Sequence, residues 1–129
     1  MKYLFALFLM IAFSTFAQKV PEHCNQIPFA KVDQNATPKD DLQKLIEKEL
    51  PKKLKKGDYN ATLKLYVNCK GETEKSTYQN GNLDTDQQSW LTNIIDKVKW
   101  KAAVREDNYV TSTVFIEVSI INGKASIKI

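Results

Sequence analysis

The sequence predicts an α+β domain in which a small antiparallel sheet of three to four strands packs against two helices. Two segments, 37–50 and 84–97, carry apolar residues at the spacing of amphipathic helices. Two others, 61–68 and 113–129, alternate apolar and polar residues as half-buried strands do. With 129 residues in all, the chain suits one domain with one hydrophobic core.

Residues 1–17 have the pattern of a secretory signal peptide. One lysine precedes an apolar run, and small residues lead to an expected cleavage after Ala17. The apolar run of about 14 residues is shorter than the roughly 20 that a membrane-spanning helix needs. We therefore expect a periplasmic or secreted protein with no membrane span after cleavage, made of an extended N-terminal segment, 18–36, and one domain, 37–129.

Cys24 and Cys69 are the two cysteines of the chain. In an exported protein, a pair of cysteines favours a disulfide over a metal site. The bridge would close a loop of about 46 residues and stabilise the fold by roughly 4 kcal/mol through chain entropy. We expect this disulfide to tie the N-terminal segment to the domain.

The first helix is expected over 37–50. Thr37 is a candidate N-cap, Pro38 suits the first helical position, and two aspartates complement the helix dipole in the first turn. Pro51 ends or kinks the helix. The lysines clustered from Lys48 to Lys56 are interpreted as a solvated helix end, with binding of an anionic partner as the weaker alternative.

A first strand is expected over 61–68, with Leu63, Leu65 and Val67 on one side. Gly71 in "NCKGE" supplies the left-handed conformation of a short hairpin turn. A weaker and more polar strand, at about 73–79, returns along the first and suits an exposed position in the sheet.

The second helix is expected to begin near Asp84, which forms a capping box with Gln87, and to run to about Lys97. Its apolar stripe, which should lie on the sheet, consists of Trp90, Ile94 and Val98. Trp100 follows the helix and is interpreted as a plug that covers the end of the core. A ligand-stacking site is the alternative for this tryptophan.

The final segment, 113–129, predicts a hairpin because Asn122-Gly123 lies between two alternating runs. Counting outward from the turn, where Ile121 pairs with Lys124, gives five further cross-strand pairs, and each face of the hairpin is self-consistent. The pairs are Ile120 with Ala125, Val118 with Ile127 and Ile116 with Ile129 on one face, and Ser119 with Ser126 and Glu117 with Lys128 on the other.

The order of elements resembles a known family. A helix, a strand, the "VNCKGE" hairpin, a second strand, the "LDTDQQSWLTNIIDKVK" helix, "WKAA" and a long alternating strand resemble the C-terminal domain of TonB-type energy transducers, in its small exported form, over about 41–121. The family's Tyr-Pro before the first strand is absent, and Ala102 stands where proline is usual. Energy transduction needs a membrane anchor, so the resemblance implies only the binding mode, in which an extended peptide joins a sheet edge or two copies exchange strands.

A catalytic centre, a metal site and a cofactor are not expected. His23 is the only histidine and lies beside a cysteine that we expect to be oxidised. Metal-ligand spacings such as Cys-x-x-Cys are absent, as are glycine-rich phosphate loops. The formal net charge of +4 is too mild to indicate nucleic-acid binding.

We therefore expect a non-enzymatic interaction module that binds an envelope protein or peptide by strand addition, or forms a homodimer by strand exchange. Whether the C-terminal strand caps the receiving edge is left open by the sequence. The alternative function is a small inhibitor or effector of an extracellular enzyme, acting through the loop 104–110; a hydrolase with paired carboxylates is a weaker third hypothesis. The candidate interaction residues are Trp100, Tyr109, Lys124, Ser126 and Lys128.

Overall fold

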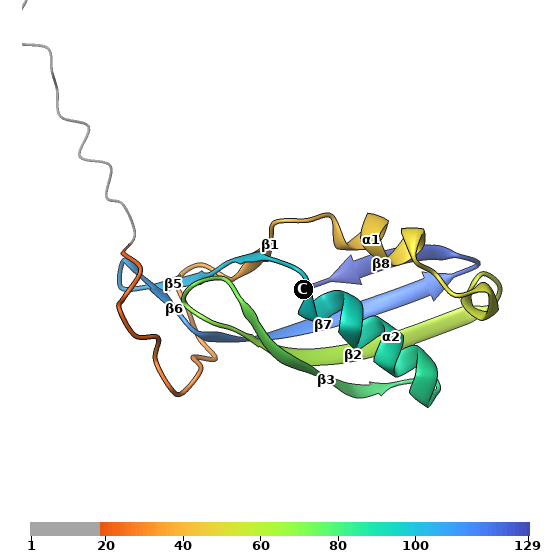
Figure 1. Ribbon diagram of the computed structural model, residues 1–129, viewed down its shortest axis with the longest axis horizontal. Helices are drawn as coiled ribbons and strands as arrows, with labels where there is room; N and C mark the ends of the chain where they lie inside the picture. Colours follow the sequence, from red (N-terminus) through yellow and green to blue (C-terminus); the bar gives the residue numbers. More distant parts are fainter. Residues whose placement is uncertain (1–18) are drawn as a thin grey trace, which may run out of the picture.

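The computed structural model describes residues 19–129 and has the predicted α+β architecture. The expected signal peptide, 1–17, lies outside the described residues. The main sheet is antiparallel and four-stranded, in the order β3-β2-β7-β8, and two small two-stranded sheets, β1-β4 and β5-β6, lie toward one end of the molecule (Figure 1). These four short strands were not expected from the sequence.

The elements follow one another along the chain with both helices placed before the long final hairpin. Their bounds are β1 (Thr37–Pro38), α1 (Leu42–Lys48), the 3-10 turn η1 (Lys52–Leu54), β2 (Asp58–Val67), β3 (Thr73–Gly81), α2 (Thr85–Asp96), β4 (Trp100–Lys101), β5 (Ala103–Arg105), β6 (Asn108–Val110), β7 (Ser112–Ile121) and β8 (Lys124–Lys128).

The first helix is shorter than predicted. Instead of starting at Thr37, α1 begins after Asp41, whose carboxylate accepts a hydrogen bond from the backbone N–H of Lys44 at 3.2 Å. Thr37 and Pro38 form β1 and pair with β4. A residue before proline favours extended backbone, and aspartate caps a helix better than threonine, so both local preferences place the start later.

The second helix and the final hairpin agree with the prediction. In α2, Asp84 and Gln87 form the capping box, with hydrogen bonds of 2.8 Å and 3.0 Å. In the hairpin, Asn122 and Gly123 both adopt positive φ, as a two-residue turn of this kind requires. The β7-β8 ladder has the expected register but ends at the pair of Glu117 and Lys128, so the predicted pair of Ile116 and Ile129 is not part of it.

One face of the main sheet is buried and the other is open to solvent. Alternate residues of β2 and β7 join the side chains of both helices in a single core. Trp100 is 1% exposed and belongs to this core. The buried sheet residues with the least exposure are Leu63, Leu65, Val67, Ile116, Val118 and Ile120.

The N-terminal segment packs along the end of the domain that carries the short strands. The expected disulfide joins Cys24 to Cys69. Single bridges link Phe29 to β7 and Gln34 to β5. The turn between β2 and β3 is fixed at the same end, because the carbonyl of Gly71 accepts a hydrogen bond from the N–H of Trp100 at 3.0 Å.

Candidate interaction surface

The two outer edges of the main sheet are each partly capped by the helix beside them. On β8, the backbone N–H of Ala125 donates to the carboxylate of Glu47 in α1 at 2.9 Å. On β3, the N–H of Ser76 donates to the carboxylate of Asp96 in α2 at 2.8 Å. The pairing of β3 with β2 also contains two register shifts. Carboxylate caps and bulges are known means of preventing another strand from joining an edge.

A third edge is left open because β8 covers only half of β7. The ladder between them spans β7 from Glu117 to Ile121, so no strand of residues 19–129 lies beside the first half of β7 on that side. In the part of the chain that the structure describes, the N-terminal segment pairs with it at one point only. There the N–H of Phe29 donates to the carbonyl of Thr111 at 3.0 Å, and the N–H of Thr113 donates to the carbonyl of Phe29 at 3.1 Å.

Phe115 has an unpaired backbone at this edge. The N–H of Thr113 points away from β2, and because the direction of N–H and C=O groups alternates along a strand, those of Phe115 point the same way. The β8 ladder has ended by this point and the N-terminal segment has left the strand. Within residues 19–129, these two groups of Phe115 therefore have no backbone partner.

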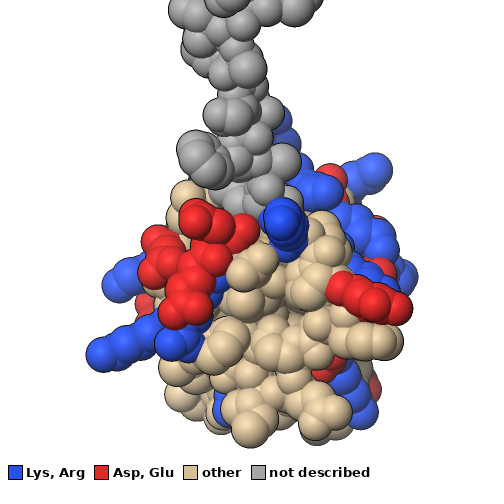
Figure 2. Space-filling model, turned by 90° about the vertical axis from the view of Figure 1, so that its left-hand side faces the viewer, with Lys and Arg blue, Asp and Glu red and all other residues tan. Residues whose placement is uncertain are grey.

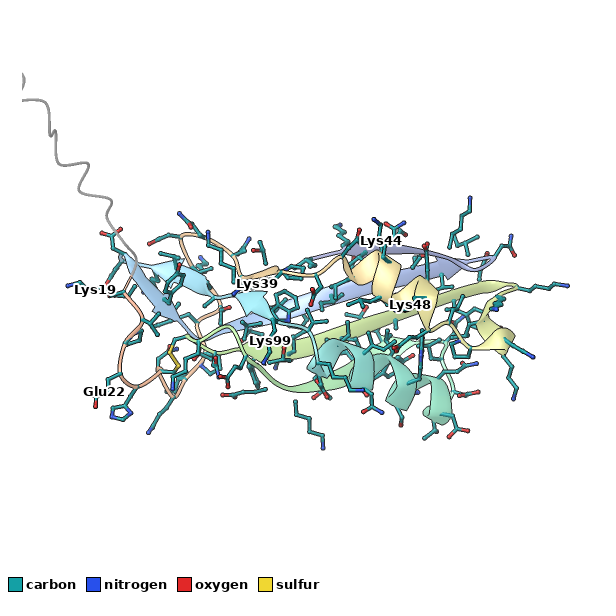
Figure 3. All side chains as sticks on the ribbon, turned by 45° about the horizontal axis from the view of Figure 1, so that its top comes forward. Lys19, Glu22, Lys39, Lys44, Lys48 and Lys99 are labelled. Carbon is teal, nitrogen blue, oxygen red and sulfur yellow. A yellow bond between two sulfur atoms is a disulfide. The ribbon has the colours of Figure 1, made fainter. Side chains whose placement is uncertain are left out.

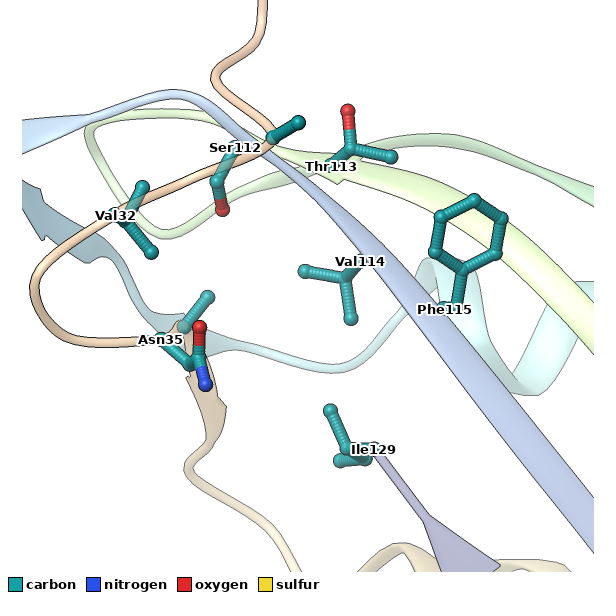
Figure 4. A pocket seen from close by; sticks show the side chains of 9 residues that line it. Val32, Asn35, Ser112, Thr113, Val114, Phe115 and Ile129 are labelled. Atoms are coloured by element: carbon teal, nitrogen blue, oxygen red, sulfur yellow. The ribbon is translucent and has the colours of Figure 1, made fainter.

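A groove of about 200 Å³ lies against this open edge, and we call it the edge groove. It lies between the end of β8, the N-terminal segment and the start of β7, and Figure 4 shows its side chains around one space. None of the side chains that line it is ionisable. The lining residues include Val32, Asn35, Ala36, Ser112, Val114 and Ile129.

Ser112 supplies the one buried polar side chain of the edge groove. It is 2% exposed, and its hydroxyl oxygen has no hydrogen-bond partner among the described residues. Figure 4 shows this hydroxyl directed toward the space between Val32 and Val114. A buried hydroxyl without a partner costs free energy in the folded state.

The residues predicted as an interaction site fall into two separate places. Trp100 is buried and Tyr109 is half-buried, and both line a different groove, of about 190 Å³, together with lysines such as Lys39; Figure 3 shows Lys39 close to β1. The other three, Lys124, Ser126 and Lys128, are exposed on β8.

The β8 residues lie on the solvent face of the sheet. Lys128 is 4.0 Å from the carboxylate of Glu117, and both side chains are largely exposed. The structure therefore brings Trp100 near Tyr109 but does not join the five residues in one site.

Sequence reasoning missed the residues of the edge groove, although two carry a visible signal. Ser112 is a polar residue at a position of β7 that faces the core. Phe115 is a large apolar residue at a position that faces solvent, and it is 53% exposed. Both interrupt the alternation that predicts the strand. Such out-of-phase residues mark either a strained position or a surface with a second use.

The loop 104–110 is a tight hairpin rather than an irregular connection. Its tip residues Glu106 and Asp107 have φ of 51° and 62°, which is uncommon for residues other than glycine. The tip is held from both sides. Asp33 accepts a hydrogen bond from the N–H of Glu106 at 2.8 Å, and Lys19 pairs with the β6 strand through the N–H of Tyr109 at 3.1 Å.

Figure 2 looks onto the end of the molecule that carries this hairpin. A cluster of acidic side chains lies at the left of this view with basic side chains beside it, further basic side chains and some acidic ones lie at the right, and a largely uncharged surface lies between and below them. Val20 and Ile27, both in the N-terminal segment, are 57% and 81% exposed. This end therefore offers apolar as well as charged groups to a partner.

Comparisons with known proteins do not assign the chain to a family. No family model matches it, and neither does any curated protein or solved structure. Among residues 19–129, no helix is both long enough and apolar enough to cross a membrane. Within the same range, histidine, cysteine, aspartate and glutamate side chains do not form a group of three that would hold a metal ion.

Proposed function

We propose that this protein is a non-enzymatic interaction module, periplasmic or secreted, that binds an extended segment of a partner protein by adding it as a strand to β7. The observation that carries the proposal is the unpaired backbone of Phe115 beside the edge groove. Both outer edges of the sheet have a carboxylate cap, whereas residues 19–129 supply none to this inner edge. The binding mode is the one implied by the resemblance to TonB-type C-terminal domains.

The length of the open edge limits the length of the segment that it binds. From Thr113 to Glu117, β7 advances about 13 Å, which accommodates about three extended residues. Backbone hydrogen bonds to Phe115 provide affinity that does not depend on sequence, and the edge groove provides selectivity through one side chain. The partner is therefore expected to contribute a short extended stretch, such as a chain end or an exposed loop.

The disulfide supports the proposed compartment. Cys24 and Cys69 are bonded to each other, and structural disulfides persist in oxidising compartments such as the periplasm and the extracellular space. An envelope protein with an exposed extended segment is accordingly the kind of partner that we propose.

Selection from a displayed library of random heptapeptides tests this function. The purified, disulfide-bonded protein is the bait, and the variant Ala30→Trp is the control, because Ala30 is exposed and lines the edge groove. Lys31→Trp adds the same bulk to an exposed neighbour that does not line it. Enriched peptides should bind the wild type and Lys31→Trp but not Ala30→Trp. Peptides that bind all three proteins equally, or a selection without enrichment, would speak against strand addition here.

A second candidate function, inhibition of an extracellular enzyme, is favoured by the fixed conformation of the β5-β6 tip. Glu106 and Asp107 are held in a left-handed turn before any partner binds, which lowers the entropic cost of inserting the tip into a cleft. Replacing the pair by Asn-Gly keeps a turn of this type and removes both side chains. If the protein inhibits any of a panel of extracellular proteases, this variant should lose the inhibition; a panel without inhibition removes the candidate.

A further inference from the structure

We infer that a second groove, of about 190 Å³ beside β4, binds the phosphate group of a ligand, and we call it the lysine groove. Three lysines from three separate segments line it, namely Lys39, Lys70 and Lys101. The lysine groove shares no lining residue with the edge groove, so this inference is independent of the proposed strand addition. It uses the direction of the lysines, their unpaired charge and the fixed positions of the segments that carry them.

Strand alternation directs the lysines of the β1-β4 pair toward solvent. Pro38 lies opposite Trp100, which is buried. The N–H of Lys39 donates to the carbonyl of Lys99 at 2.8 Å, so these two residues lie opposite each other one step further along. Because successive residues of a strand project to opposite faces, Lys39, Lys99 and Lys101 share the solvent face. Figure 3 shows Lys39 and Lys99 close to each other.

Lys70 reaches the lysine groove from the other edge of β4. It belongs to the turn between β2 and β3, and the carbonyl of the next residue, Gly71, accepts the N–H of Trp100 at 3.0 Å. The carbonyl of Lys99 and the N–H of Trp100 belong to one peptide unit and point in opposite directions. Backbone hydrogen bonds therefore hold β1 and the turn on either side of β4 before a ligand binds, which lowers the entropic cost of binding.

The ammonium groups that line the lysine groove are unpaired. Within residues 19–129, none of the three forms a hydrogen bond or an ion pair, and the lining residues include no acidic side chain. Like charges that lie opposite each other on paired strands, as Lys39 and Lys99 do, destabilise the pairing. The free protein therefore carries a repulsion at this place that a bound anion would offset.

The residue types favour phosphate over other anions. Lysine binds phosphate as a point charge, whereas carboxylates suit the planar guanidinium of arginine, and the described lining contains no arginine. A phosphate monoester carries a charge of about −1.5 to −2 at pH 7 and has three acceptor oxygens, one for each lysine. The volume lies below the roughly 300–1,000 Å³ of cofactor sites, so the lysine groove accommodates the phosphate group and leaves most of a larger ligand outside.

A titration with glycerol 3-phosphate tests the inference. The purified, disulfide-bonded protein is used at constant ionic strength, and binding is followed by the amide signals of Lys70 and Lys101 in ¹⁵N NMR spectra. These signals should shift and saturate with a Kd of about 1 mM or below. Acetate should bind at least about fivefold more weakly, because it carries one negative charge and only two oxygens. Equal binding of acetate would overturn the assignment to phosphate.

A pair of double variants separates the lysine groove from the net charge of the protein. Lys39→Gln with Lys101→Gln should weaken binding of glycerol 3-phosphate at least about tenfold. The control, Lys44→Gln with Lys48→Gln, removes the same number of charges at exposed positions of α1 outside the lysine groove (Figure 3). It should bind as the wild type does. Equal weakening in the two double variants would overturn the site.

Vesicles show whether the phosphate belongs to a lipid or to a soluble ester. Vesicles of phosphatidylcholine with a minor fraction of phosphatidic acid are sedimented with the wild type and with the Lys39→Gln, Lys101→Gln variant. Sedimentation of the wild type alone would support the inference and identify a lipid headgroup as the source. Binding of glycerol 3-phosphate without sedimentation would support it with a soluble ester. Binding to neither probe would overturn it and leave strand addition at β7 unaffected.

Discussion

The carboxylate of Glu47 accepts a hydrogen bond from the backbone N–H of Ala125 at 2.9 Å, so α1 occupies an outward-facing donor of the edge strand β8. Asp96 does the same for Ser76 at 2.8 Å on the opposite edge. The outward direction of the Ala125 N–H also shows which backbone groups of β7 face β8. They are the N–H and C=O groups of the odd-numbered residues of β7. Among these residues, Phe115 is the one whose partner position is empty.

Removal of the cap on β8 should destabilise the protein. Glu47→Ala leaves the N–H of Ala125 without its acceptor and should lower the free energy of unfolding by about 1.5 kcal/mol, within the range for hydrogen bonds to charged groups. Glu49→Ala, at an exposed position two residues later, should change it by less than about 0.5 kcal/mol. Urea unfolding measures both variants, and equal effects would show that the cap contributes nothing.

Gly71 should be the least replaceable of the turn glycines. A Cβ at this position would lie 2.1 Å from the backbone carbonyl oxygen of Trp100, and φ is +79°. Gly57 has a φ of +99°, but its nearest neighbour would be the ring of Tyr59 at 3.4 Å. We expect Gly71→Ala to cost at least about 3 kcal/mol and Gly57→Ala about 1 kcal/mol. Thermal unfolding that ranks them the other way would contradict the close approach of β4 to this turn.

The disulfide should account for a large part of the stability. Replacing Cys24 and Cys69 together by serine frees a loop whose ends are 45 residues apart, which should lower the free energy of unfolding by about 4 kcal/mol. Urea titration of the wild type with and without reductant gives the same comparison in one protein. The N-terminal segment should lose protection from amide exchange first, and a loss of less than about 1 kcal/mol would mean that its packing alone holds it.

Two buried serines should respond differently to truncation. The hydroxyl of Ser112 has no partner, so Ser112→Ala should leave the free energy of unfolding unchanged or raise it slightly. The hydroxyl of Ser76 donates to the carbonyl of Thr92 at 3.4 Å, so Ser76→Ala should lower it by about 1 kcal/mol. Similar losses in both variants would show that Ser112 has a partner in the free protein.

Local signals explain which elements were predictable from the sequence. The start of α2 follows from Asp84 and Gln87, and the last hairpin follows from Asn122-Gly123, because each signal lies within the element that it specifies. The start of α1 was predicted wrongly because Thr37 has a competing use as a β-strand residue. Its partner strand, β4, is more than 60 residues away in the chain, and no local pattern reports such pairing.

The edge groove is formed by segments that lie far apart in the sequence, and a local sequence pattern does not show where each of them ends beside β7. It exists because β8 stops at Lys128 while β7 extends further, and because the N-terminal segment leaves β7 after Phe29. The register of the hairpin was predictable, but the path of the N-terminal segment was not. The predicted interaction residues on β8 are exposed as expected of alternate strand positions, yet they face away from the edge groove.

Amide hydrogen exchange of β7 in the free protein tests the central claim most directly. The N–H groups of Val114 and Ile116 point toward β2 and should be protected, whereas that of Phe115 should exchange at least about a hundredfold faster. Adding a selected peptide should then slow Phe115 without changing its neighbours. Equal protection of all three amides in the free protein would contradict the account, because the edge that we propose as the binding site would already be paired.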